Sequence, residues 1–180
     1  MSNILTITGD INLDTYKMVL DFIKNLGPID TLTERKKITI IINSCGGSVT
    51  YGFSIYDLLT MCNFDITTIA IGCCESIATI LFSLGNKRYI TPNSIFSIHS
   101  AAYRVENLIL TESDAMEKFN ILRNDNHKII NCYLNSYNFK MSKKELDDIF
   151  SSGKDYTFSA LEACQKGFAT DIITYISQIL

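Results

Sequence analysis

The sequence shows no excess of positive charge, and this absence excludes one broad class of function. Its 180 residues include 16 Lys and Arg against 19 Asp and Glu, which gives a formal net charge of −3 at pH 7. A nucleic-acid-binding domain normally presents a basic patch to the phosphate backbone. With 47% hydrophobic and 19% charged residues, the composition instead predicts a folded domain that does not bind nucleic acid.

Metal-ligand patterns are also scarce. The chain has only two histidines, and its six cysteines include no pair with Cys-x-x-Cys spacing. A zinc site therefore has few ligands to draw on, and adjacent cysteines such as Cys73 and Cys74 rarely bridge each other. We expect six buried, reduced thiols in a reducing compartment, namely Cys45, Cys62, Cys73, Cys74, Cys132 and Cys164.

No targeting or membrane segment is indicated. The N-terminus lacks a basic region followed by a long apolar one, so we expect no signal peptide. The most apolar stretch, residues 66–84, is interrupted by polar residues and predicts a strand and a helix rather than a membrane span. Repeats and linkers are absent as well. Residues 1–180 are therefore expected to form one domain, in the cytoplasm or an equivalent reducing compartment.

What the sequence does contain is a regular alternation of strand and helix patterns. Strands are expected at 4–8, 38–42, 64–71, 88–90, 95–98 and 172–176, and helices at 13–26, 49–61, 76–84 and 111–137. Two short helices are expected after Ser142 and Ser159, which open capping-box patterns. Such alternation favours an α/β fold with a mainly parallel sheet.

Gly46 and Gly47 are the first feature that could carry chemistry. They follow a buried strand, and two glycines let the backbone approach a ligand while leaving N–H groups unblocked. The alternative is a tight strand-to-helix turn with no further role. A phosphate loop is excluded, because the Lys-Ser/Thr pair of that motif is missing.

Ser76 is the second feature, placed between an apolar strand and a helix expected to begin at Ser76 itself. We expect residues 72–75 to form the tight turn between them. Nucleophilic serines favour such strand–turn–helix elbows, because the turn also supplies an N–H, here that of Ile77, to a developing oxyanion. The alternative is a serine that only caps the helix N-terminus.

His99 and Asp155 complete the set of candidates. His99 follows the predicted strand 95–98, where active sites of α/β proteins gather, whereas His127 falls within the long helical pattern. Asp155 lies in a loop before a capped helix and could hold an imidazole in one tautomer. Asp147 and Asp148 are rivals for that role. Each residue by itself also has an ordinary structural interpretation.

The order of these features along the chain resembles one known family. Residues 41–57 (IINSCGGSVTYGFSIYD), 72–78 (GCCESIA), 87–94 (KRYITPNS), Ile98-His99 and 155–163 (DYTFSALEA) are similar to motif blocks of the Clp protease proteolytic-subunit family. The resemblance covers about residues 38–176. It implies a serine endopeptidase that cleaves polypeptides through an acyl-enzyme.

The resemblance also implies roles, fold and partners. It assigns Ser76, His99 and Asp155 as the catalytic triad, and the N–H groups of Gly47 and Ile77 as the oxyanion hole. The implied fold consists of repeated ββα-type units, as in Clp proteases and crotonases, with a long handle helix within about residues 100–140. The implied assembly is a homo-oligomer of two stacked heptameric rings, working with an AAA+ unfoldase that uses ATP. No metal or organic cofactor is implied.

Several positions depart from the family pattern. Cys45 stands where proline is usual, Glu75 replaces a small residue, and residues 100–104 replace a glycine-containing strand. The first strand begins at Ile4, which predicts a divergent member with a short N-terminus. Two alternatives therefore accompany the peptidase hypothesis. One is a catalytically silent ring subunit, and the other is an acyl-CoA enzyme of crotonase architecture.

Overall fold

The computed structural model describes residues 3–27, 35–103, 111–175 and 177. Its seven strands form one mostly parallel sheet, in which β1, β2, β3, β4 and β7 are neighbours in that order. β5 pairs with β3 in parallel, and β6 pairs with β5 in antiparallel. The strands are β1 Ile4–Thr8, β2 Lys37–Ser44, β3 Asp65–Glu75, β4 Lys87–Ile90, β5 Ile95–Ile98, β6 Tyr156–Phe158 and β7 Asp171–Ile172.

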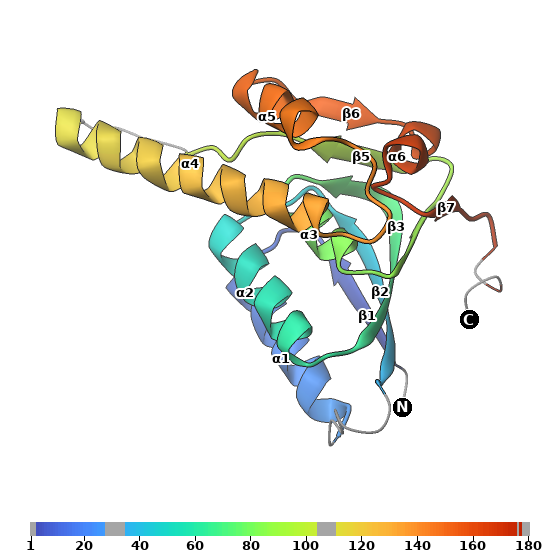
Figure 1. The fold of residues 1–180 in the computed structure, drawn as a ribbon. Coiled ribbons are helices and arrows are strands. Elements are labelled where there is room, and N and C mark those ends of the chain that lie inside the picture. Colours follow the sequence, from blue (N-terminus) through green and yellow to red (C-terminus); the bar gives the residue numbers. More distant parts are fainter. Residues whose placement is uncertain (1–2, 28–34, 104–110, 176, 178–180) are drawn as a thin grey trace.

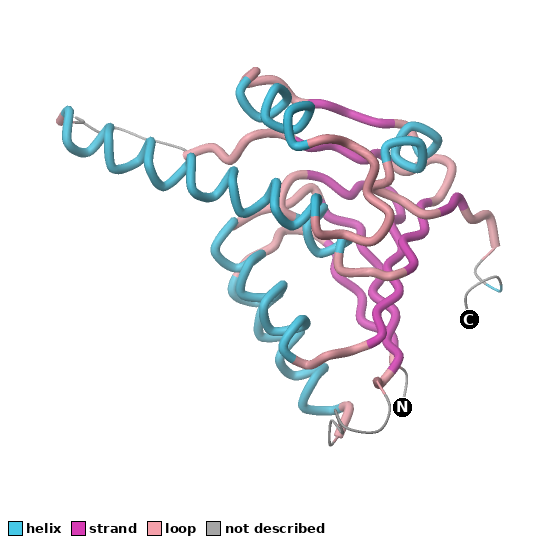
Figure 2. Tube along the Cα trace, in the orientation of Figure 1, coloured by secondary structure: helices cyan, strands magenta, loops and turns pink. Residues whose placement is uncertain are grey.

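Six helices connect these strands, and they confirm the α/β class. Figure 1 shows α1 and α2 lying side by side against the strands, while α4 extends well beyond the body of the domain. Figure 2 shows most of the strands (magenta) gathered in one layer to the right of these two helices. The helices are α1 Leu13–Asn25, α2 Val49–Met61, α3 Ala78–Ser83, α4 Glu112–Leu134, α5 Lys143–Ser151 and α6 Ala160–Lys166.

β3 is the longest strand, and it changes partners along its length. Residues Thr67–Ala70 pair with β4, whereas residues Cys73–Glu75 pair with β5. The expectation of a turn at 72–75 is therefore wrong. The small residues there gave a turn-like pattern, but β5 supplies a parallel neighbour that a local pattern does not contain.

Most other element predictions are confirmed within two or three residues. α2 begins and ends where expected, and capping boxes open α5 at Ser142 and α6 at Ser159. α6 ends at Gly167, whose φ of +81° is the left-handed conformation that favours glycine. Two expectations need correction. The final strand is only Asp171–Ile172. β6 was not foreseen, because its three residues pair with a strand 58 to 62 positions earlier.

Arg88 is a fully buried cation that joins the sheet to the C-terminal part of the chain. Its guanidinium donates to the carbonyl oxygens of Phe168 at 2.7 Å, Gly85 at 2.9 Å and Gly167 at 3.0 Å, and also to that of Tyr137. Burial lowers the pKa of Arg88 to about 10, so the side chain stays charged at neutral pH. It is therefore held in place by carbonyl dipoles.

The cysteines do not follow the expectation of six buried thiols. Cys74 alone among them is buried, Cys45 is exposed, and the other four are half-buried. All six are free thiols. Among the described helices, none is long and apolar enough to cross a membrane.

Candidate active site

Ser76 occupies a strained turn directly after β3. Its φ is +54°, a left-handed conformation that costs a non-glycine residue about 1–2 kcal/mol. The N-cap of α3 is Ile77, and it has no side-chain capping bond. The interpretation of Ser76 as a helix cap is therefore wrong, and so is the expected helix start at Ser76. A serine in a strained strand-to-helix turn is instead typical of a nucleophile elbow.

Backbone hydrogen bonds hold this elbow from two sides. The N–H of Ser76 donates to the carbonyl oxygen of Ser97 in β5 at 2.9 Å. The carbonyl oxygen of Ser76 accepts from the N–H of Thr79 at 3.1 Å and from the Thr79 hydroxyl. The turn is thus anchored both to the neighbouring strand and to the first turn of α3.

Gly46 lies against this turn, and Gly47 lies against Ile11. A Cβ on Gly46 would come within 2.7 Å of Ser76 Cβ and 3.2 Å of Ser76 Oγ. A Cβ on Gly47 would meet the Ile11 carbonyl oxygen at 2.4 Å. Both positions also have positive φ, +101° and +146°. Glycine is therefore required at both places for steric as well as conformational reasons.

The N–H groups of Gly47 and Ile77 are available for a ligand. Ile11 pairs with this loop by donating to the Gly46 carbonyl and accepting from the Ser48 N–H, both at 2.8 Å. This pairing leaves the N–H of Gly47 unused. Within the described part of the chain, neither that N–H nor the N–H of Ile77 donates to a protein acceptor. Two unpaired donors beside Ser76 are what an oxyanion hole requires.

Strand register brings His99 and Asp155 to the same place. Ile98 of β5 is paired with Tyr156 of the antiparallel strand β6. His99 follows Ile98 and Asp155 precedes Tyr156, so the next step of the register places these two residues opposite each other. Directly opposed residues of an antiparallel pair project to the same face. His99 and Asp155 thus lie at adjoining ends of β5 and β6, and β5 pairs with β3, which ends at Glu75 directly before Ser76.

Each of the three residues directly adjoins one of the paired strands β3, β5 and β6. His99 is half-buried, Asp155 is exposed, and in the described residues no hydrogen bond joins Ser76, His99 and Asp155 to one another. Instead, His99 Nδ1 lies 2.8 Å from the carbonyl oxygen of Ser100. Since a carbonyl can only accept, this contact places the proton on Nδ1 and leaves Nε2 able to accept a proton. Their assignment as a triad stays a prediction.

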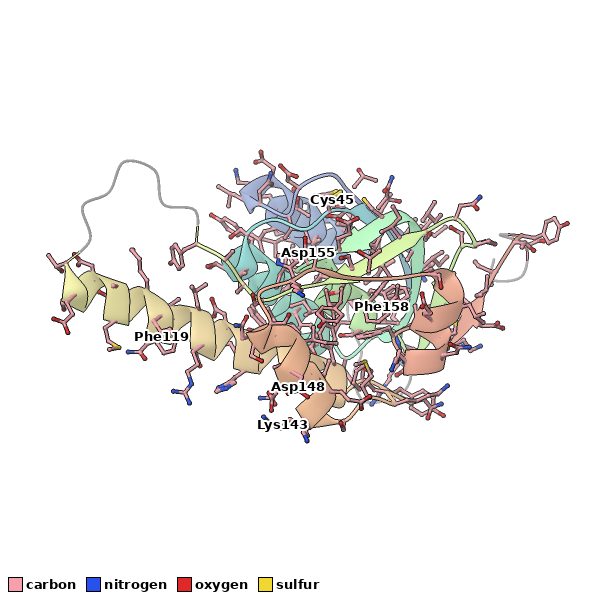
Figure 3. All side chains as sticks on the ribbon, turned by 90° about the horizontal axis from the view of Figure 1, so that it is seen from above. Cys45, Phe119, Lys143, Asp148, Asp155 and Phe158 are labelled. Atoms are coloured by element: carbon pink, nitrogen blue, oxygen red, sulfur yellow. The ribbon has the colours of Figure 1, made fainter. Side chains whose placement is uncertain are left out.

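Both rival acids belong to α5. Asp147 accepts from Lys143 at 2.7 Å on α5, and Asp148 is exposed on the same helix. In Figure 3, Asp148 lies on the α5 side of the domain with Lys143, whereas Asp155 lies nearer to Cys45 and the end of the sheet. His127, the other histidine, is exposed on α4. The register of β5 with β6 therefore favours Asp155 and His99 over these alternatives.

Two residues that support the Ser76 turn, Thr79 and Tyr133, were not foreseen from the sequence. Tyr133 of α4 is fully buried, and its hydroxyl contacts the Thr79 hydroxyl. Since Thr79 donates its proton to the Ser76 carbonyl, Tyr133 must be the donor to Thr79. Burial raises the pKa of Tyr133, so it keeps its proton. Thr79 could have been found, since a helical threonine often bonds a carbonyl three residues back. Tyr133 had no such signal.

A cavity adjoins the His99 segment. It has a volume of about 560 Å³ and lies between α4 and α5. Ser100 and Ala101, which directly follow His99, form one wall of the cavity. Apolar residues of the other walls include Phe119 and Phe150. The N–H of Ala101 is fixed to Asn126 Oδ1 at 2.7 Å. A cavity of this size could accept a side chain of a bound peptide.

Comparison with known proteins confirms the family resemblance of the sequence. The sequence model of one family, described as Clp protease, matches residues 1–175. The chain is 31% identical over 143 residues to the ATP-dependent Clp protease proteolytic subunit 2 of Tropheryma whipplei, covering 78% of this chain and 75% of that protein.

Two further relatives bear similar names. The proteolytic subunit 2 of Mycolicibacterium paratuberculosis is 29% identical over 147 residues, or 80% of this chain and 70% of that protein. The ATP-dependent Clp protease proteolytic subunit of Ligilactobacillus salivarius is 38% identical over 98 residues, or 53% of this chain and 48% of that protein.

Proposed function

The chain belongs to the Clp protease family of serine-type peptidases, and we propose that Ser76, His99 and Asp155 are its catalytic triad. The observation that carries this proposal is the tight contact of the Gly46-Gly47 loop with a strained Ser76, which leaves two N–H groups unpaired beside the hydroxyl. That combination serves a nucleophile and has no evident structural purpose. The names of the relatives favour an active peptidase over a silent subunit or an acyl-CoA enzyme.

The proposed reaction is peptide-bond hydrolysis through an acyl-enzyme. His99 Nε2 takes the proton of Ser76 Oγ, which attacks the scissile carbonyl carbon. The N–H groups of Gly47 and Ile77 donate to the oxyanion as it forms. His99 then gives its proton to the leaving amine, and water releases the acyl group by the same route in reverse. Each step uses only side chains and backbone of this chain, so no cofactor is proposed.

Asp155 is proposed to balance the positive charge on His99 in this mechanism. The Nδ1 proton of His99 is held by the Ser100 carbonyl at 2.8 Å. A carbonyl fixes the tautomer but carries no full charge to balance an imidazolium. We therefore propose that Asp155 accepts a hydrogen bond from the Nδ1–H when a peptide is bound, since catalytic hydrogen bonds often tighten only in the substrate complex.

The working form is proposed to be a ring. Clp proteases form ring-shaped oligomers that work with Clp ATPases, and we propose two stacked heptamers of this chain, in the cytoplasm or an equivalent compartment. Residues 1–180 would be one peptidase domain, with the handle at about 100–140. α4 projects from the body and exposes Met116, Phe119 and Ile121, which suits a helix that packs on another subunit. A single monomeric species in analytical ultracentrifugation would contradict this assembly.

Covalent labelling tests the site directly. A fluorophosphonate should modify the assembled protein at Ser76, and Ser76→Ala should abolish both labelling and hydrolysis of a fluorogenic peptide. Ser113→Ala, which removes an exposed hydroxyl of α4, is the matched control and should change neither. Labelling at a different serine, or unchanged hydrolysis by Ser76→Ala, would reject the proposal.

A further inference from the structure

Two cysteines from different strands meet beside the Ser76 turn. Cys45 directly follows β2, Cys73 lies in β3, and their sulfur atoms are 3.1 Å apart. They are 28 residues apart in the sequence. Of the six cysteines, these are the two whose sulfurs contact each other. A disulfide needs a sulfur separation of about 2 Å, so a further approach of about 1 Å would join them.

The backbone around this pair is held in place by Asn43. The Asn43 Oδ1 atom accepts from the Cys73 N–H at 3.1 Å and contacts Cys73 Sγ at 3.4 Å. Gly72 has a φ of +75°, and a Cβ there would come within 2.7 Å of the same oxygen. The pairing of β2 with β3 is irregular here, shifting between Ile42 and Ser44. This irregularity and the missing Cβ let Cys73 turn toward Cys45.

The pair is accessible to a small oxidant. Cys45 is exposed and Cys73 is half-buried, whereas the neighbouring Cys74 is fully buried and lies on the opposite face of β3. We propose that Cys45 and Cys73 are a redox modification site, which peroxide converts to a reversible disulfide. On the proposed function given above, this disulfide slows acylation of Ser76 by displacing the oxyanion loop.

The oxidation balances with hydrogen peroxide as the named oxidant. The exposed Cys45 thiolate attacks one peroxide oxygen, an S–O bond forms, the O–O bond breaks, and the departing hydroxide takes a proton to become water. The Cys73 thiol then attacks Cys45 Sγ, forming the S–S bond and expelling the hydroxyl group as a second water with the Cys73 proton. Two thiols lose two electrons, and one peroxide becomes two waters. A dithiol reductant reverses the change.

The order of attack follows from the surroundings of Cys73. Burial raises the pKa of the Cys73 thiol to about 11, and the hydrogen bond with Cys45 and the nearby Glu75 carboxylate add to the shift. Cys73 therefore stays protonated at neutral pH and is the poorer nucleophile toward peroxide. It reacts in the second step, where its proton passes to the departing hydroxyl group as the S–S bond forms. Cys45, being exposed, is where peroxide arrives first.

The consequence for the site follows from the lack of space around Gly46. Cys45 immediately precedes Gly46, which already packs against Ser76 so closely that a Cβ would stand 2.7 Å from Ser76 Cβ. Drawing Cys45 toward β3 must shift Gly46 and Gly47 relative to Ser76. A misplacement of about 1 Å in a catalytic group can cost about 100-fold in rate. We expect the oxidised protein to acylate at least about tenfold more slowly.

Mass spectrometry decides whether the disulfide forms, independently of any peptidase activity. The full-length protein is treated with hydrogen peroxide, free thiols are blocked, and the digest is searched for a peptide pair joining Cys45 to Cys73 with the loss of two hydrogen atoms. Cys45→Ser should abolish the pair, and Cys132→Ser should leave it intact. Oxidation of Cys45 to sulfinic acid without a cross-link would overturn the proposal.

The rate of fluorophosphonate labelling at Ser76 then tests the consequence. It should fall on oxidation, recover with dithiothreitol, and stay constant under peroxide in Cys45→Ser. If the cross-linked protein were labelled as fast as the protein with free thiols, the inhibitory role would be overturned. If the reduced protein itself did not label, the proposed peptidase site would fail, while the cross-link would still decide the pairing of Cys45 with Cys73.

Discussion

The N–H of Ser76 donates a 2.9 Å hydrogen bond to the carbonyl oxygen of Ser97. This bond fastens the end of β3 to β5, the strand that delivers His99 two residues later. The separation of the proposed nucleophile and base is therefore set by backbone pairing. β6 extends the same pairing to Asp155 through its register with β5. Three segments distant in the sequence are thus fixed relative to one another by one edge of the sheet.

Replacing the proposed triad acid should reduce activity without affecting the fold. We expect Asp155→Asn to lower kcat/KM for a fluorogenic peptide by at least about 100-fold, because nothing else would carry the charge that balances the His99 imidazolium. The thermal unfolding temperature should not change, since Asp155 is exposed. Asp148→Asn on α5 is the matched control, and an equal loss from it would argue against Asp155.

Adding a methyl group at Gly46 should disturb the site more than the fold. Gly46→Ala and Gly9→Ala both put alanine at a positive φ, +101° and +73°. The conformational cost alone should lower stability by about 1 kcal/mol in Gly9→Ala, and Gly46→Ala should lose more because of its collision. A Cβ at Gly9 meets nothing within 4 Å, whereas one at Gly46 collides with Ser76. Only Gly46→Ala should slow fluorophosphonate labelling, by about tenfold or more. Equal labelling rates for the two variants would contradict the close packing described here.

Removing the Tyr133 hydroxyl should loosen the Ser76 turn. Tyr133→Phe takes away the donor to Thr79, whose own hydroxyl donates to the Ser76 carbonyl. We expect a loss of about 1 kcal/mol in the free energy of unfolding, measured by urea denaturation, and slower labelling of Ser76. Tyr137→Phe, which changes an exposed ring, should do neither. Labelling at the wild-type rate in Tyr133→Phe would show that this hydrogen-bond chain does not position Ser76.

Replacing Arg88 should have the largest effect on stability. Arg88→Met preserves much of the buried volume but leaves the carbonyl oxygens of Gly85, Gly167 and Phe168 without their donor. Each buried unsatisfied group costs about 1–3 kcal/mol, so a total loss of about 3 kcal/mol or more is expected. Arg123→Met, at an exposed site on α4, should change the urea midpoint little. A similar midpoint for both variants would contradict the structural role of Arg88.

The capping boxes should make part of the stability depend on pH. Hydrogen bonds from the Ser142 N–H and hydroxyl lower the pKa of Glu145 below its ordinary value of 4.5. A lowered pKa in the folded state stabilises the protein above the unfolded value, and this contribution is lost as the pH falls through the folded value. Glu145→Gln should therefore be less stable than wild type near neutral pH, and the difference should shrink in acid. The measurement is urea denaturation at neutral pH and at a pH below the pKa of Glu145. Glu117→Gln, which changes an exposed residue within α4, should show no such dependence on pH.

Local sequence patterns are sufficient to locate most helices and strands and to identify the candidate site residues. Apolar periodicity and capping patterns located helices such as α2 and α6 because those signals act over a few residues. The ordered motifs around Gly46, Ser76, His99 and Asp155 indicated the family and the proposed roles. The motif at residues 155–163 also favours Asp155 over Asp148 as the proposed triad acid.

The positions of these residues depend on contacts between segments that are distant in the sequence. That β3 continues through residues 72–75 depends on pairing with β5, and the position of Asp155 depends on β6, a three-residue strand with no signal of its own. The support of Ser76 by Tyr133 and the contact of Cys45 with Cys73 likewise join distant segments. Such contacts form when whole strands and helices pack together. Local sequence patterns do not predict these contacts, because they reflect interactions over a few residues and not the pairing of distant strands or side chains.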